Sequence, residues 1–296
     1  MSLRRHLLNL QLRLFEKPHL ARVSDPTEVR AGFETKARLF FHGPRGSRYA
    51  PGQVAGVPVT WAFGPRVTRG AGPVLLYFHG GGYVFGSPAT HRTMLARLSH
   101  LTGLPACLPD YRKAPEHEFP CAVEDGLAVL NALSDHPGGV ILGGDSAGGG
   151  LALAVLAEAL RRGVPAPRAA FALSPLTDLT FSGESQARNA QSDVMLPAAR
   201  AGEMAEMYLQ GADPRDPRAS PLFADFTGAG PVWICAGDTE ILLDDTRRMA
   251  SALRAQGVTV TEVIEHDLPH VWPLFQRLLP EAGATLRNLA GWIRSL

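Results

Sequence analysis

The feature that most constrains this 296-residue chain is a serine between small residues, the run GDSAG at positions 144–148. An apolar run at 139–143 precedes it, and a helix-like stretch at 151–160 follows. A strand that turns sharply into a helix strains its corner residue, and small neighbours make such a turn feasible. The pattern predicts that the Ser146 hydroxyl is exposed at a strand end, as a nucleophile would be. An ordinary glycine-rich turn is the alternative interpretation.

A second glycine-rich run, HGGG at positions 79–82, directly follows the strand-like residues 74–78. Acyl transfer develops an oxyanion, which fixed backbone N–H donors stabilise. The expected donors are Gly81, Gly82 and Ala147, the residue after the nucleophile, with Gly80 as an alternative. A phosphate loop would need a following Gly-Lys-Ser/Thr or a GxGxxG run opening a helix. Neither pattern follows here.

These two runs and the segment DYRKAPEH at 110–117 occur in an order that resembles the hormone-sensitive-lipase family of α/β-hydrolases, in its bacterial carboxylesterase branch. The resemblance extends from about residue 72 to the end of the chain, through LSPLTD at 173–178 and LPHVW at 268–272. The first fifty or so residues match only weakly. The resemblance implies a serine esterase for short- to medium-chain carboxylic esters, with a covalent acyl intermediate and no cofactor.

A serine hydroxyl needs a base to accept its proton and an acid to orient that base. In α/β-hydrolases the order is serine, acid, histidine, which leaves His266 and His270 as candidate bases. His270 lies in a proline-containing loop between a strand-like run at 259–264 and an apolar, helix-like stretch at 271–279. His270 is therefore the expected base, and His266 is expected to be a solvated loop residue.

Two carboxylates, Asp238 and Glu240, follow the strand-like run at 232–236. The resemblance places the acid about thirty residues before the histidine, at Glu240, although aspartate is the commoner residue there in the family. Asp238 remains the alternative acid, and Asp178 is a third candidate because it follows another strand end. The resemblance further implies that Asp110, Arg112 and Glu116 form a structural polar network beside the site.

Strand-like and helix-like runs alternate along the chain, which is typical of an α/β fold with a mostly parallel sheet. The expected strands are 57–63, 74–78, 106–108, 140–142, 169–173, 232–236 and 259–264, and the expected helices are 90–101, 122–133, 147–162, 243–256 and 284–293. The candidate residues follow strand ends, where such sheets place their ligands. We expect an α/β-hydrolase catalytic domain over 51–296, an N-terminal cap segment at 1–50, and a second cap insertion at about 180–226 with a helical run at 197–210.

Near the N-terminus, Leu3, Leu7, Leu10 and Leu14 recur at helical spacing and form an apolar stripe. Packing against the domain is the expected use of this stripe, and docking on a membrane surface or on a partner is the alternative. Polar residues interrupt the segment too early for a secretion signal, and no run of eighteen apolar residues could span a bilayer.

Composition excludes other classes of function. The 29 Lys and Arg residues nearly balance 28 Asp and Glu, so the net charge of +1 does not favour nucleic acid as a partner. No zinc-ligand spacing occurs, and three cysteines indicate free thiols in the reducing cytoplasm. The expected partner is a small-molecule ester, and a homodimer is left open. The alternative functions are an amidase or carbamate hydrolase on the same triad, or a non-catalytic ligand-binding protein.

Overall fold

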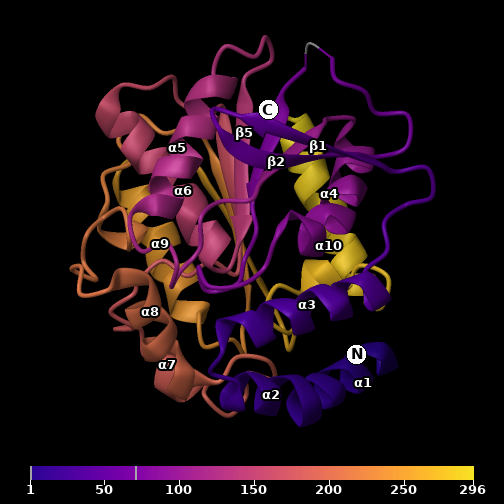
Figure 1. Ribbon diagram of the computed structural model, residues 1–296, viewed down its shortest axis with the longest axis vertical. Coiled ribbons are helices and arrows are strands. Elements are labelled where there is room, and N and C mark those ends of the chain that lie inside the picture. The colour runs from indigo at the N-terminus through magenta and orange to yellow at the C-terminus, as the bar shows by residue number, and fades with distance from the viewer. Residues whose placement is uncertain (1, 71) are drawn as a thin grey trace.

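The computed structural model describes residues 2–70 and 72–296, which form an eight-stranded sheet with helices on both faces (Figure 1). The strand order is β1-β2-β4-β3-β5-β6-β7-β8. β1 and β2 pair antiparallel, as do β2 and β4, and all other neighbours are parallel. The strands are β1 (Arg48–Val54), β2 (Val57–Phe63), β3 (Val74–Phe78), β4 (Ala106–Pro109), β5 (Val140–Asp145), β6 (Ala169–Leu173), β7 (Val232–Gly237) and β8 (Val260–Glu265).

The central strands are almost entirely apolar, as expected for a sheet covered on both faces. In β3, Leu76 and Phe78 belong to the hydrophobic core on one face, whereas Leu75 and Tyr77 belong to the core on the other. Figure 1 shows α5 (Cys121–Leu133), α6 (Ala147–Arg162) and α9 (Leu243–Ala255) on one side of the sheet, with α4 (Pro88–Thr102) and α10 (Pro280–Arg294) on the other.

Two chain segments lie outside this layered core, across the end of the sheet at the bottom of Figure 1. The first is α1 (Leu3–Gln11), which continues through the π-helical turn η1 (Leu12–Glu16) into α2 (Lys17–Arg22), followed by α3 (Pro26–Phe40). The second contains α7 (Ser185–Arg188), η2 (Ala198–Arg200), α8 (Ala201–Leu209) and η3 (Pro221–Phe223). Among the described residues, none of the helices has the length and apolar character needed to cross a membrane.

The predicted fold class is confirmed, and seven strands lie where the sequence predicts them to within three residues. β1 was not predicted, and it begins at Arg48, so the expected boundary at residue 50 falls inside a strand. The helix expected over 271–279 is wrong. A short 3₁₀ turn, η4 (Trp272–Phe275), stands there instead, and α10 begins only at Pro280.

The leucine stripe near the N-terminus does not pack against the domain, so that expectation is wrong. The side chains of Leu3, Leu7, Leu10 and Leu14 are 54–75% exposed. The opposite face of the helix is the buried one, with Leu8 and Leu12 in the core that contains α4 and α10. Polar contacts fix this choice of face, because Arg5 on the buried side donates to the carbonyl of His266.

Candidate active site

The backbone of Ser146 forms the sharp turn between β5 and α6. Its φ of +53° and ψ of −126° are unusual for a residue with a side chain. The turn is held by its own hydrogen bonds, because the Ser146 N–H donates to Leu173 (2.9 Å) and its carbonyl accepts from Leu176 (2.9 Å). The neighbouring strand β6 and the loop after it therefore fix the backbone that carries the Ser146 hydroxyl.

Glycines beside Ser146 are required by close backbone contacts. A Cβ on Gly144 would lie 2.1 Å from the carbonyl oxygen of Gly148. A Cβ on Gly148 would lie 2.2 Å from the carbonyl oxygen of Phe78, the last residue of β3. Both distances are far below van der Waals contact, so the turn can form only with glycine at these positions.

His270 and Glu240 complete a chain of hydrogen bonds with Ser146. The Ser146 Oγ lies 2.9 Å from Nε2 of His270, and Nδ1 of the same ring lies 2.6 Å from Oε2 of Glu240. The histidine is 3% exposed and the glutamate 1% exposed, whereas Ser146 is half-buried. The structure thus brings together the three residues expected from the sequence, in the order of a nucleophile, a base and an orienting acid.

Burial and the surrounding carboxylates together set the proton affinity of His270. Burial of the imidazole lowers its pKa, but the charge and hydrogen bond of Glu240, together with the charges of Asp193 and Asp145, raise it by more. The pKa of His270 therefore lies above its ordinary value. An imidazole held in this way accepts a proton more readily than a free one.

Glu240 is itself fixed by two donors to its second oxygen, Oε1. These are the N–H of Gly237 (2.6 Å) and the hydroxyl of Ser174 (2.8 Å). The Ser174 oxygen also accepts from the N–H of Val271, next to the histidine, at 3.2 Å. Sequence reasoning missed Ser174, since nothing in the LSPLTD run indicates which of its side chains turns toward the acid.

The alternative acids and the alternative base lie elsewhere. Asp238 accepts from the ring of His266 (2.7 Å) and from the N–H of Asp267 (2.8 Å), and the His266 side chain is 73% exposed. Asp178 accepts from hydroxyls in its own loop and from Arg248 (2.9 Å). In the described part of the chain, no three His, Cys, Asp or Glu side chains are grouped to hold a metal ion.

The glycine run after β3 offers backbone donors beside Ser146. The N–H of Gly80 is already used, because it donates to Asp145 Oδ1 at 3.1 Å. Those of Gly81, Gly82 and Ala147 have no hydrogen-bond acceptor among residues 2–70 and 72–296. Gly81 and Gly82 also line the cleft into which Ser146 opens. These three N–H groups, which the sequence predicts as oxyanion donors, are therefore free of other acceptors.

Gly81→Ala is expected to lower kcat by about 100- to 1000-fold, the effect of losing one oxyanion donor. The Cβ would lie 2.2 Å from the Phe85 carbonyl oxygen at a φ of +125°, so the loop must move. The control is Gly291→Ala in α10, where a Cβ meets nothing within 4 Å. Steady-state kinetics and melting temperatures of both variants test this, and an unchanged kcat in Gly81→Ala would contradict it.

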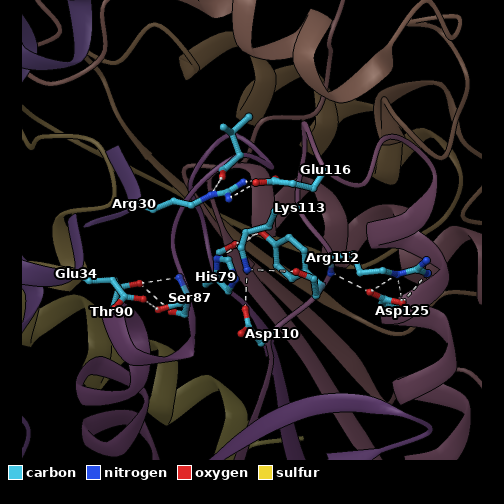
Figure 2. Close-up of polar contacts among 12 residues, drawn as sticks. Arg30, Glu34, His79, Ser87, Thr90, Asp110, Arg112, Lys113, Glu116 and Asp125 are labelled. Atoms are coloured by element: carbon cyan, nitrogen blue, oxygen red, sulfur yellow. Dashed lines mark hydrogen bonds and ion pairs between the residues drawn. The ribbon is translucent and has the colours of Figure 1, made fainter. Parts of the chain in front are cut away.

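Polar side chains around the glycine run form separate pairs and not the single network expected (Figure 2). Lys113 pairs with Asp110 at 2.6 Å, Arg112 with Asp125 at 2.8 Å, and Arg30 with Glu116 at 2.7 Å. The first pair lies within the loop after β4, the second joins that loop to α5, and no two pairs share a partner, so the prediction of one connected network is wrong. The third pair reaches the N-terminal segment, because Arg30 belongs to α3.

Cationic side chains that donate to backbone carbonyls join the first outer segment to the core and the two outer segments to each other. The contacts are Arg5 to His266 (3.0 Å), Lys17 to Ala190 (2.7 Å) and Asp193 (2.6 Å), Arg30 to Val84 and Ala114 (2.7 Å each), and Arg200 to Ala21 (3.3 Å) and Val23 (3.1 Å). Figure 2 also shows Glu34 of α3 beside Ser87, whose hydroxyl donates to it at 2.8 Å.

A largely apolar cleft, partly open to solvent, leads to Ser146 and His270. Both outer segments supply its walls, the first through residues 16–36 and the second through 195–207. Apolar side chains from the two segments include Val29, Phe33, Met195, Leu196 and Met204. Tyr83 and Phe85, from the loop after the glycine run, line it as well. The cleft can therefore hold an apolar substrate against the serine.

Comparison with known proteins agrees with this geometry. A family model described as an alpha/beta hydrolase fold matches residues 75–274, which include all three residues of the hydrogen-bonded chain. An acetyl-hydrolase from Streptomyces hygroscopicus is 40% identical over 251 residues, covering 81% of this chain and 84% of its own. A crystal structure of EstE5 soaked with p-nitrophenyl butyrate superposes with a TM-score of 0.93 at 37% identity, covering 100% of this chain and 99% of the other.

A crystal structure of an esterase from the bacterial hormone-sensitive lipase family also superposes, with a TM-score of 0.93 at 35% identity over 100% of this chain and 98% of the other. The chain belongs to the hormone-sensitive-lipase family of esterases. This confirms the family, the fold and the class of enzyme expected from the sequence. In this family member, the residue hydrogen-bonded to Nδ1 of His270 is Glu240, which departs from the aspartate expected to be commoner there.

Proposed function

We propose that this protein is a serine carboxylesterase that hydrolyses short- to medium-chain carboxylic esters through an acyl-enzyme intermediate. The observation that carries the proposal is the continuous hydrogen-bond chain from Ser146 through His270 to Glu240. It lies beside backbone donors that are left without acceptors in the described structure. A nucleophile, its base and an oxyanion site are the parts that acyl transfer needs.

In the first half of the reaction, Ser146 Oγ attacks the ester carbonyl carbon while Nε2 of His270 takes the hydroxyl proton. The carbonyl π electrons move onto oxygen, and the N–H groups of Gly81, Gly82 and Ala147 stabilise that oxyanion. When the intermediate collapses, the bond to the leaving alcohol breaks and the alcohol takes the proton from His270. Glu240 stabilises the imidazolium formed between these steps.

In the second half, a water molecule replaces the alcohol. His270 removes one water proton as the water oxygen attacks the acyl carbon, and the same donors hold the second oxyanion. Collapse breaks the bond to Ser146, which regains a proton from His270, and the carboxylic acid leaves. No external oxidant, reductant or cofactor enters this balance.

The outer segments, residues 1–50 and 180–226, are proposed to act as a cap that sets substrate size. Their apolar side chains line the cleft next to Ser146. An apolar wall favours an aliphatic acyl or alcohol group through burial. We therefore expect the length of the acyl chain to affect kcat/KM strongly.

A panel of p-nitrophenyl esters from acetate to palmitate tests the function. The wild type is expected to give its highest kcat/KM at or below the octanoate and to lose at least about tenfold toward palmitate. The matching p-nitroanilide, included in the panel, should react far more slowly, and faster anilide turnover would indicate an amidase. A wild type with no turnover on any substrate would indicate a binding protein.

In the profile of kcat/KM against pH, the midpoint of the acidic limb should lie above the ordinary imidazole pKa of about 6.5. His270 accepts a proton only when neutral, and its pKa is raised in the folded protein. Activity should therefore fall as pH drops through that raised pKa and level off above it. The check is kcat/KM for p-nitrophenyl butyrate against pH, and a half-maximal point clearly below pH 6 would contradict it.

The cytoplasm is the proposed location. Cys107 and Cys235 are buried free thiols, and Cys121 is a partly buried one. Free thiols of this kind are typical of reducing compartments. Subcellular fractionation of a native host, with antibodies against the protein, would test the location directly.

A further inference from the structure

The outer face of the N-terminal helix carries an apolar surface that the domain leaves uncovered. Leu3 is 75% exposed, Leu7 59%, Leu10 54% and Leu14 57%. We call these four side chains the leucine stripe. Phe15, 70% exposed, lies next to its end. Exposed large apolar side chains grouped in this way mark an interaction surface more often than isolated ones do.

The stripe is a fixed feature of the helix and not a frayed end. At about 100° per residue, Leu3, Leu7 and Leu10 fall within a sector of about 60°. The opposite sector is anchored, since Asn9 donates to the carbonyl of Asp267 at 3.2 Å and Arg5 forms an ion pair with the Asp267 carboxylate at 3.3 Å. The anchored face points the leucine stripe away from the domain.

Basic side chains border the stripe. Arg4 is exposed on one side of it, and His6 and Arg13 are exposed on the other. Over residues 2–22 the sequence has five Lys or Arg residues and one carboxylate, Glu16. An apolar stripe between basic rims is typical of helices that lie in the surface of an anionic bilayer. Two copies packed through this stripe would bring like charges together, which disfavours a dimer here.

The same continuous helix leads to the active-site cleft. Beyond the stripe it carries Glu16, His19 and Leu20, all of which line the cleft. A surface that holds the stripe therefore lies close to one wall of the cleft. This arrangement would let an ester pass from the bilayer surface into the cleft over a short path.

We infer that the outer face of α1 docks this protein on an anionic phospholipid surface. The helix lies in the plane of that surface, the leucine stripe enters the acyl region, and the basic rims bind lipid phosphates. The consequence that esters reach the cleft from the surface rests on the proposed function. The docking itself does not.

The test compares the double variant Leu7→Glu/Leu14→Glu with Leu278→Glu, a control at an exposed leucine outside the helix, 41% exposed. Each protein is sedimented with vesicles of equal parts phosphatidylglycerol and phosphatidylcholine. The wild type and the control are expected to bind, and the double variant to partition at least about tenfold less. Vesicles of phosphatidylcholine alone, or high salt, should weaken wild-type binding.

The matched readout is p-nitrophenyl butyrate hydrolysis in solution, which should stay within about twofold of wild type in both variants because neither site touches the cleft. Wild type that fails to sediment, or a double variant that sediments equally, would overturn the docking. Light scattering that finds the wild type as a dimer and the double variant as a monomer would also overturn it. Binding by a protein inert toward every ester would instead overturn the proposed reaction and leave the docking intact.

Discussion

Ser146→Ala is expected to lower kcat for p-nitrophenyl butyrate by about a million-fold, leaving only the slow hydrolysis that the remaining site supports. The variant removes the oxygen that forms the acyl bond while keeping a side chain that tolerates the same backbone turn. Its melting temperature should therefore stay close to that of the wild type. Single-turnover and steady-state kinetics on highly purified protein measure the loss.

His270→Ala and the double variant Ser146→Ala/His270→Ala sharpen this result. When residues act as one unit, removing either one removes their combined effect. The kcat of the double variant should therefore lie within about tenfold of that of each single variant. Losses that multiply would show that the two side chains act independently. Equal rates in the wild type and Ser146→Ala would place the reaction at another nucleophile.

Glu240→Gln should lower kcat by about 1000- to 10,000-fold, whereas Asp238→Asn should stay within about tenfold of wild type. The amide of glutamine can stay in place but cannot stabilise the imidazolium. The matched asparagine at Asp238 keeps an acceptor for the N–H of Asp267 and lies away from His270. Both exchanges replace a carboxylate by its isosteric amide, so size does not differ.

The pH profile of Glu240→Gln gives an independent readout. Since the Glu240 charge raises the pKa of His270, its removal should move the acidic limb of the residual activity to lower pH. Asp238→Asn should leave that limb unchanged. A large loss of activity in Asp238→Asn, with near-normal activity in Glu240→Gln, would show that Asp238 and not Glu240 is the acid.

The local parts of the site could be predicted from sequence because each is encoded in a few adjacent residues. The turn at Ser146 needs glycines at fixed offsets, and the free donors at Gly81 and Gly82 follow from a run without side chains. The choice between Asp238 and Glu240 was not local. It depends on the side chains that each carboxylate contacts in the folded protein. The hydrogen bond from Ser174 to Glu240, for example, joins residues that lie far apart in the sequence.

The outer segments were harder to predict for the same reason. Periodicity reveals an apolar stripe but not which side of a helix faces the domain, and here Arg5 and Asn9 find partners in the His266–Asp267 loop while the leucines do not. β1 contains Pro51 and Gly52 and is mostly exposed at the sheet edge, so it lacks the apolar alternation of a strand. The helix at α3 did carry a signal, because Asp25 before Pro26 is a typical helix start.

The attachment of the outer segments through carbonyl groups has a consequence for how the enzyme can diversify. A carbonyl is present whatever the side chain, so only the cationic member of each contact is encoded by residue type. Substitutions at Ala190 or Val23 can leave the bonds to Lys17 and Arg200 intact, with no compensating change on the other side. Under the proposed function, single substitutions in these walls can therefore change substrate preference while the walls themselves stay in place.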